Sequence, residues 1–68
     1  MQMVPINSMD ILSFGYKDLT LHIRFSSGEL YAYYNVPASI YNGFKSASSH
    51  SKYFHTNIKG RYDDTRIG

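Results

Sequence analysis

Apolar and polar residues alternate most regularly in the segment LTLHIRF (19–25). Apolar side chains occupy every second position from Leu19 onward, and polar side chains, including Arg24, lie between them. This alternation predicts a β-strand with one apolar and one polar face. The preceding segment, 9–16, is rich in β-prone residues and predicts another strand, so a tight turn is expected at 17–18.

A third strand is predicted in ELYAYYNVP (29–37), where three tyrosines fall within four positions. Pro37 ends this strand because proline cannot donate a hydrogen bond to a neighbouring strand. The sequence Ser-Ser-Gly at 26–28 precedes it and predicts a hairpin between the second and third strands.

The geometry of that turn decides which face the tyrosines occupy. If residues 26–28 form a three-residue loop with Gly28 in the left-handed conformation, Ile23 opposes Tyr31, and both Tyr31 and Tyr33 lie on the apolar face. If the turn has only two residues, the register slips by one and the same tyrosines line a polar, cationic face. We favour the first register because so small a core needs large side chains, but the sequence is compatible with both.

The hydrophobic period changes after Pro37, which suits the first position of a helix. Apolar side chains at Ile40 and Phe44 recur at helical spacing. A second short helix is predicted over about 50–58, with Ser49 as its cap.

These elements predict a single domain over residues 1–68 with an α+β fold. It consists of a three-stranded antiparallel β-meander with two short helices packed on one face. Residues 1–7 are expected to form an irregular arm, and residues 61–68 an irregular tail without hydrophobic periodicity. The other face of the sheet is then open to solvent or to a partner.

The chain has 68 residues, with seven Tyr, four Phe and no Cys or Trp. Aromatic side chains must therefore supply much of a small core. The absence of cysteine excludes disulfides and cysteine-based metal sites and favours a cytoplasmic location. No signal peptide is recognisable, and no segment has the roughly 20 apolar residues of a membrane span, so no membrane association is expected.

The formal net charge is +2 and the isoelectric point is about 9.0. A charge of this size indicates only a mild preference for anionic partners. The C-terminal region is the most basic part of the chain, although Asp63 and Asp64 partly offset its charge. Its cations are Lys52, Lys59, Arg61 and Arg66.

A Tyr-x-Tyr motif at 31–33 is followed by Val-Pro at 36–37, and the segments SMDILSFGY (8–16), KYF (52–54) and NIKGRY (57–62) lie around it. In order and spacing these segments resemble the KTSC domain, named for its occurrence at the C-terminus of some lysyl-tRNA synthetases. The resemblance covers about residues 8–67.

The KTSC family also includes single-domain bacterial and phage proteins. Its function is not established, and the resemblance implies RNA as a partner through the synthetase association. This chain departs from the family's pattern at Ser51, where glycine is usual, and at His55, where asparagine is usual. Both changes bear on any ligand that this loop would hold.

Ser49 and Lys52 predict a phosphate site at the start of the second helix, because the free N–H groups and partial positive charge there attract anions. Lys59 and Arg61 lie near in sequence and are expected to close over the phosphate. Ser49 would also cap the helix with no ligand present, so the sequence leaves both roles open.

Arg24 and Tyr33 extend this hypothesis to nucleic acid, because aromatic side chains on a sheet stack with bases while cations neutralise phosphates. The alternative is that the tyrosines pack in the core and Arg24 is solvated. The candidate ligand-binding residues are Arg24, Tyr33, Ser49, Lys52, Lys59 and Arg61.

We therefore expect a small non-enzymatic module that binds RNA or another phosphate-bearing, nucleotide-type ligand. No catalytic residue or cofactor is assigned, and no metal site is expected, because the interval from His50 to His55 does not place both on one helical face. The alternative is a protein-interaction module. Examples are a phage or plasmid factor that inhibits a host protein or sequesters a nucleotide signal, and a homodimer joined through strand edges.

Overall fold

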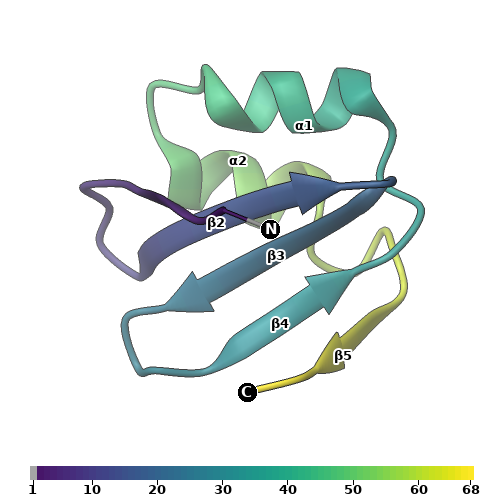
Figure 1. Cartoon of the computed structure of the whole chain (residues 1–68). Helices are drawn as coiled ribbons and strands as arrows, with labels where there is room; N and C mark the ends of the chain where they lie inside the picture. Colours follow the sequence, from purple (N-terminus) through teal and green to yellow (C-terminus); the bar gives the residue numbers. More distant parts are fainter. Residues whose placement is uncertain (1) are drawn as a thin grey trace.

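The five strands of the sheet pair in the order in which they follow along the chain, and every pair is antiparallel. The computed structural model describes residues 2–68, and Figure 1 shows their course. Both helices are inserted between the last two strands. The elements are β1 (Val4–Pro5), β2 (Ile11–Lys17), β3 (Thr20–Phe25), β4 (Leu30–Tyr33), α1 (Ala38–Lys45), α2 (His50–Asn57) and β5 (Asp64–Arg66).

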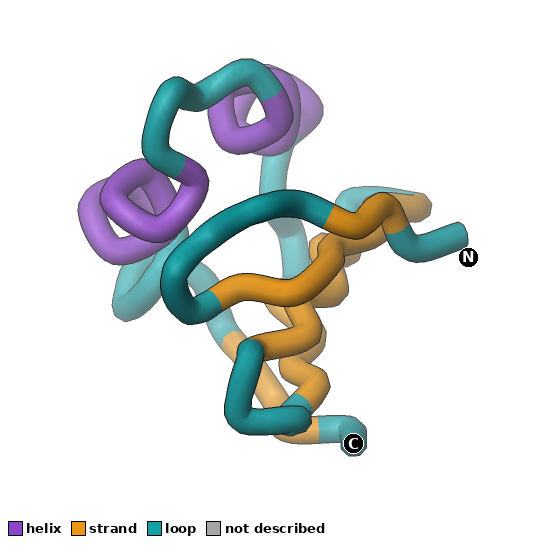
Figure 2. The backbone as a smooth tube through the Cα atoms, turned by 90° about the vertical axis from the view of Figure 1, so that its left-hand side faces the viewer, coloured by secondary structure: helices purple, strands orange, loops and turns teal. Residues whose placement is uncertain are grey.

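Both helices lie on the same side of the sheet, as Figure 2 shows. Their buried side chains, Phe44 of α1 and Phe54 of α2, join strand residues in one core. Phe14 of β2 packs edge to face against Phe44, with ring centroids 5.1 Å apart. The predicted α+β fold, with two short helices on one face of an antiparallel sheet, is confirmed.

The prediction of only three strands is wrong, because a short strand flanks the predicted meander on each side. β1 pairs with β2 through Val4 and Pro5, inside the segment 1–7 that was expected to be irregular. β5 pairs with β4 inside the segment 61–68. Both short strands have exposed side chains, so backbone pairing forms them and no hydrophobic period marks them in the sequence. Met1 lies outside the described residues.

The hairpin of β3 and β4 adopts the favoured register, in which Ile23 pairs with Tyr31. The Phe25 N–H donates to the Glu29 carbonyl at 2.8 Å, and Gly28 has a φ of 100°. This angle lies in a region that glycine adopts without a Cβ clash. The three-residue loop therefore places the side chains of Tyr31 and Tyr33 on the helix side of the sheet.

The expected place of Leu19 on the apolar face of β3 is wrong. Asp18 and Leu19 are the two central residues of the turn between β2 and β3, with φ angles of 52° and 64°, and β3 begins only at Thr20. Positive φ at both positions is typical of a type I′ turn, whose twist matches that of the strands. Leu19 is accordingly 50% exposed.

Both helix starts can be explained by local chemistry. Pro37 precedes α1 as its N-cap, with an extended ψ of 153°, and is not the first helical residue. Ser49 caps α2 as predicted, because its hydroxyl accepts a hydrogen bond from the Lys52 N–H at 3.3 Å. α2 ends at Asn57, and the buried Ile58 follows it.

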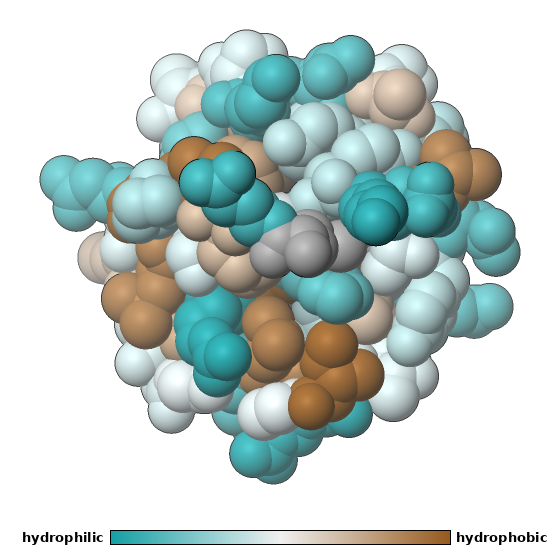
Figure 3. Space-filling model, in the orientation of Figure 1, coloured by the Kyte–Doolittle hydropathy of each residue, from teal (hydrophilic) through white to brown (hydrophobic). Residues whose placement is uncertain are grey.

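The face of the sheet away from the helices is uncovered. The register places Gly15, His22, Ala32 and Thr65 in one row across it. Figure 3 looks onto this face and shows apolar atoms over the lower strands, interspersed with hydrophilic ones. Within residues 2–68, no helix has the length and apolar character needed to cross a membrane.

Candidate functional site

A pocket of about 540 Å³ lies on the helix side of the sheet, where β4, β5 and the C-terminal half of α2 meet. We call it the tyrosine pocket, because Tyr31 and Tyr33 of β4 form its centre. α2 contributes His55, the turn after α2 contributes Lys59, and β5 contributes Asp64. Elements far apart in the sequence thus converge on one cavity.

Aromatic rings form the floor of the tyrosine pocket. Tyr31 and Tyr33 project from the same side of β4 because they are two residues apart, and their ring centroids are 6.3 Å apart with planes inclined by 28°. Tyr33 packs edge-on against Phe54 at 5.4 Å, and Tyr31 against Phe25 at 5.7 Å. Tyr33 is only 4% exposed, whereas Tyr31 is half-buried. Tyr31 therefore offers the accessible aromatic surface.

Asp64 is the cross-strand partner of Tyr33, and both residues line the pocket. Side chains directly opposite each other in an antiparallel pair share a face and lie close together. Burial raises the pKa of Tyr33 above its usual range, and the negative charge of Asp64 raises it further. The Tyr33 hydroxyl is therefore protonated at neutral pH and can donate a hydrogen bond.

Asp10, in the loop before β2, forms one wall of the pocket against α2. Its Oδ2 lies 3.2 Å from Nε2 of His55. The pKa of Asp10 is below its usual range, chiefly because of the nearby Ser51 hydroxyl and further because of His55. The other carboxylate oxygen, Oδ1, is buried and has no hydrogen-bond partner among the described residues. The Asp10 to His55 contact thus joins the loop to the helix.

The tyrosine pocket carries both signs of charge. The Glu29 carboxylate at its rim accepts a hydrogen bond from the Ser27 hydroxyl at 2.8 Å and lies 3.7 Å from Nη1 of Arg66. The lining also includes two further carboxylates and two basic side chains: Asp10, Asp64, His55 and Lys59. This mixture suits a polar ligand with both donors and acceptors better than a free phosphate, which the carboxylates repel.

The exposed side of α2 carries a row of basic side chains that ends at the tyrosine pocket. Lys52, His55 and Lys59 follow one another at intervals of three and four residues and are all exposed, so they lie along one side of the helix and the turn after it. Arg61 lies at the same end, where its Nε donates to the Thr56 carbonyl at 3.0 Å. We call Lys52, His55, Lys59 and Arg61 the α2 basic face.

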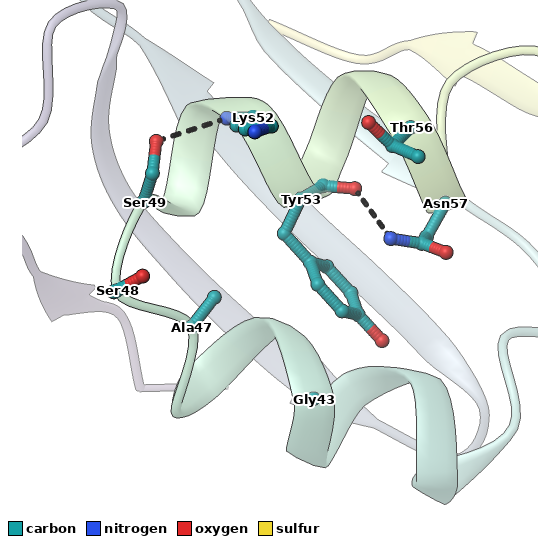
Figure 4. A pocket seen from close by; sticks show the side chains of 8 residues that line it. All are labelled: Gly43, Ala47, Ser48, Ser49, Lys52, Tyr53, Thr56 and Asn57. Atoms are coloured by element: carbon teal, nitrogen blue, oxygen red, sulfur yellow. Dashed lines mark hydrogen bonds between the residues drawn. The ribbon is translucent and has the colours of Figure 1, made fainter.

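Ser49 and Lys52 line a second pocket, of about 440 Å³, between α1 and α2. Figure 4 shows the hydrogen bond by which Ser49 caps α2, with the Tyr53 ring lying over Gly43 at the floor. A third pocket of about 350 Å³ borders the same two residues. The hydroxyl of Ser49 therefore has the capping role, and Lys52 begins the α2 basic face.

Arg24 lies on the open face of the sheet, away from the tyrosine pocket. Its Nη1 donates to the Gly28 carbonyl at 2.7 Å. The sheet separates Arg24 from Tyr33, whose side chain points toward the helices. Of the residues predicted from the sequence, the structure brings Tyr33 and Lys59 together in one pocket.

The candidate binding residues drawn from the sequence did not include Asp10, Tyr31, His55 or Asp64, which also line the pocket. Tyr31 could have been found, because it shares a face with Tyr33 in either register. Asp64 could not, because the pairing of β5 leaves no pattern in the sequence. Asp10 and His55 are 45 positions apart, and only the folded chain brings them together.

The fold and site define a small α+β domain with a meandering antiparallel sheet, two helices on one face and a tyrosine pocket beside the second helix. The family model of the KTSC domain matches residues 7–62. The chain therefore belongs to the KTSC domain family, and the resemblance noted from the sequence is confirmed.

The chain is similar to part of two lysine–tRNA ligases, from Nostoc sp. (strain PCC 7120 / SAG 25.82 / UTEX 2576) and Trichormus variabilis (strain ATCC 29413 / PCC 7937). Each is 40% identical over 43 residues, which are 63% of this chain but 8% of the ligase. It is also similar to the crystal structure of a KTSC domain protein from Yersinia pestis, with a TM-score of 0.91 and 38% identity over 98% of this chain and 97% of that chain. The fold therefore extends over nearly the whole of that protein.

Proposed function

We propose that this chain is a non-enzymatic domain that binds single-stranded RNA. One base enters the tyrosine pocket and stacks on Tyr31, and the neighbouring phosphates lie along the α2 basic face. The observation that carries this proposal is that the tyrosine pocket and the α2 basic face meet at Lys59. This residue lines the pocket and is the last basic side chain of the row along α2.

Both parts of this arrangement have known energetic roles. Stacking of a base on an aromatic side chain contributes roughly 1–3 kcal/mol, and the half-buried Tyr31 ring is available for it. Lysine and arginine side chains neutralise phosphates and release bound counterions. The matched relatives include two lysine–tRNA ligases, which are named for a tRNA. This similarity supports RNA as the ligand class.

The test is the binding of a fluorescently labelled RNA of about eight nucleotides, a length within the range of small single-strand sites. Fluorescence anisotropy gives its affinity for the wild-type chain and for the double variant Lys59→Gln/Arg61→Gln at several salt concentrations. Lys17→Gln is the matched control, because Lys17 is exposed in the hairpin of β2 and β3 and lines none of the three pockets.

The proposal requires that the wild-type affinity falls steeply as salt rises. The double variant should bind at least tenfold more weakly, and its salt dependence should be shallower by about 0.7 logarithmic units per lost phosphate contact. The melting temperatures should agree closely, since both side chains are exposed. No binding by the wild-type chain, or equal weakening by Lys17→Gln, would refute the proposal.

A further inference from the structure

Two polar groups of the tyrosine pocket come from residues that face each other on β4 and β5. The Tyr33 hydroxyl is a donor, and the Asp64 carboxylate opposite it offers two acceptor oxygens. Within residues 2–68, the carboxylates that contact a basic side chain are those of Asp10 and Glu29. The Asp64 carboxylate is therefore available to a ligand.

The two groups line the same pocket as the accessible Tyr31 ring. Tyr31 and Tyr33 are neighbours on one side of β4, and Asp64 is opposite Tyr33 on β5. A base stacked on Tyr31 would therefore lie in the cavity that the Tyr33 and Asp64 side chains also line. An edge of the base turned toward these two side chains would meet one donor and two acceptors.

Guanine has the complementary edge. Its O6 accepts a hydrogen bond, and its N1–H and N2 amino group are adjacent donors. A carboxylate can accept from both donors at once, and charge-assisted hydrogen bonds of this kind are stronger than neutral ones.

We propose that the tyrosine pocket selects guanine. The base stacks on Tyr31, its O6 accepts from the Tyr33 hydroxyl, and its N1–H and N2 amino group donate to the Asp64 carboxylate. This inference rests on the proposed binding of RNA and adds the identity of the base at the pocket.

The other bases fit this order less well. Cytosine has the opposite order, because its amino donor is followed by two acceptors, so it would place acceptors against Asp64. Adenine and uracil each present a single donor on this edge. A carboxylate left opposite an acceptor loses its hydrogen bonds on leaving water, which makes the wrong base costly.

A basic side chain of a protein partner is the other class of occupant that an acidic, aromatic pocket accommodates. Lys59 lines the same cavity and His55 lies beside it, and Glu29 is already paired with Arg66. These features disfavour a second cation. A neutral nucleobase can form hydrogen bonds with both the donors and the acceptors of the tyrosine pocket.

The experiment compares RNAs of about eight nucleotides that are all uridine except at one central position. This position holds guanosine, adenosine, cytidine, uridine or inosine, which lacks the N2 amino group. The affinities are measured for the wild-type chain and for Asp64→Asn. Asp63→Asn is the matched control, because Asp63 is the exposed neighbour and lines none of the pockets. Melting temperatures check that every variant folds.

We expect the guanosine RNA to bind about tenfold more tightly than the adenosine, cytidine and all-uridine RNAs, within the range of one bidentate contact. Inosine should lose several-fold of this preference. Asp64→Asn should abolish the ratio of guanosine to uridine affinity, and Asp63→Asn should preserve it. The ratio is the readout, because removal of one negative charge strengthens the binding of every RNA alike.

Equal affinity for all the RNAs would overturn the guanine assignment and leave RNA binding intact. Survival of the preference in folded Asp64→Asn would also overturn it. If no RNA binds, the proposed function fails together with this inference. Arginine amide and free guanosine are each added as competitors of the guanosine RNA. Equal displacement by the two would show that the pocket takes a cation and would overturn the guanine assignment.

Discussion

Gly43 of α1 lies so close to the Tyr53 ring of α2 that a Cβ atom on the glycine would collide with the tyrosine hydroxyl and ring. The Tyr53 hydroxyl donates to the Ile40 carbonyl of α1 at 3.1 Å, and so the ring crosses the gap between the helices. A glycine inside a helix is usually unfavourable by about 1 kcal/mol relative to alanine. Here its missing side chain is what allows the two helices to pack.

We therefore predict that Gly43→Ala destabilises the protein, despite its better helix propensity. Overpacking typically costs about 1–3 kcal/mol, which outweighs a propensity gain of about 1 kcal/mol. Urea denaturation of the variant measures the net change in the free energy of unfolding. The double variant Gly43→Ala/Tyr53→Leu, in which the ring is absent, should lose less than the sum of the two single variants. A more stable Gly43→Ala protein would contradict the close approach.

In the turn between β2 and β3, by contrast, the introduction of a glycine should stabilise the protein. Leu19 has a φ of 64°, a left-handed conformation that a large side chain rarely adopts, and its side chain is half-exposed. Leu19→Gly should therefore stabilise the protein by about 0.5–1 kcal/mol, because glycine relieves this strain and matches the type I′ turn. Leu19→Ala, which removes the same contacts but keeps the Cβ, is the matched control and should show no such gain. A lower urea midpoint for Leu19→Gly than for Leu19→Ala would rule this explanation out.

The alternation from Leu21 to Phe25 and the Ser-Ser-Gly sequence at 26–28 predicted the central hairpin. The need of so small a core for large side chains favoured its register. Alternation extended the strand too far at Leu19, because residue polarity does not reveal the backbone angles of a turn. β1 and β5 could not be predicted, since their side chains are exposed and their pairing lies in the backbone.

The candidate site could likewise be predicted only in part. Tyr33 and Lys59 were identified from residue type, because aromatic rings and cations are the usual partners of nucleic acids. Asp64 reaches Tyr33 only through the pairing of β5 with β4. Arg24 was grouped with Tyr33 because both suit nucleic acid, but the register that places Tyr33 toward the helices puts Arg24 on the opposite face.

The burial of Tyr33 makes the stability sensitive to alkali. Its pKa is raised in the folded state, so the folded state favours the neutral hydroxyl. This contribution is complete below the ordinary tyrosine pKa of about 10 and is lost as the pH rises above it. We predict that the free energy of unfolding falls more steeply above about pH 10 for the wild-type chain than for Tyr33→Phe. Parallel curves from denaturant titrations would contradict the assignment. Tyr34→Phe, on the exposed side of the strand end, is the control.

The contact between Asp10 and His55 makes the stability sensitive to acid. The pKa of Asp10 is lowered in the folded state, so the folded state favours the charged carboxylate. This contribution is present above the ordinary aspartate pKa of about 4 and is lost as the pH falls below it. Asp10→Asn should therefore be less stable than the wild-type chain at neutral pH.

The difference between Asp10→Asn and the wild-type chain should be smaller at about pH 3 than at neutral pH, because acid progressively removes the charge of the wild-type carboxyl group. Denaturant titrations at both pH values measure it. Asp63→Asn controls for the loss of one exposed negative charge. If the difference were the same at both pH values, Asp10 would act through its shape and not through its charge. The wall that it forms between the loop before β2 and α2 would then not depend on the negative charge of its carboxylate.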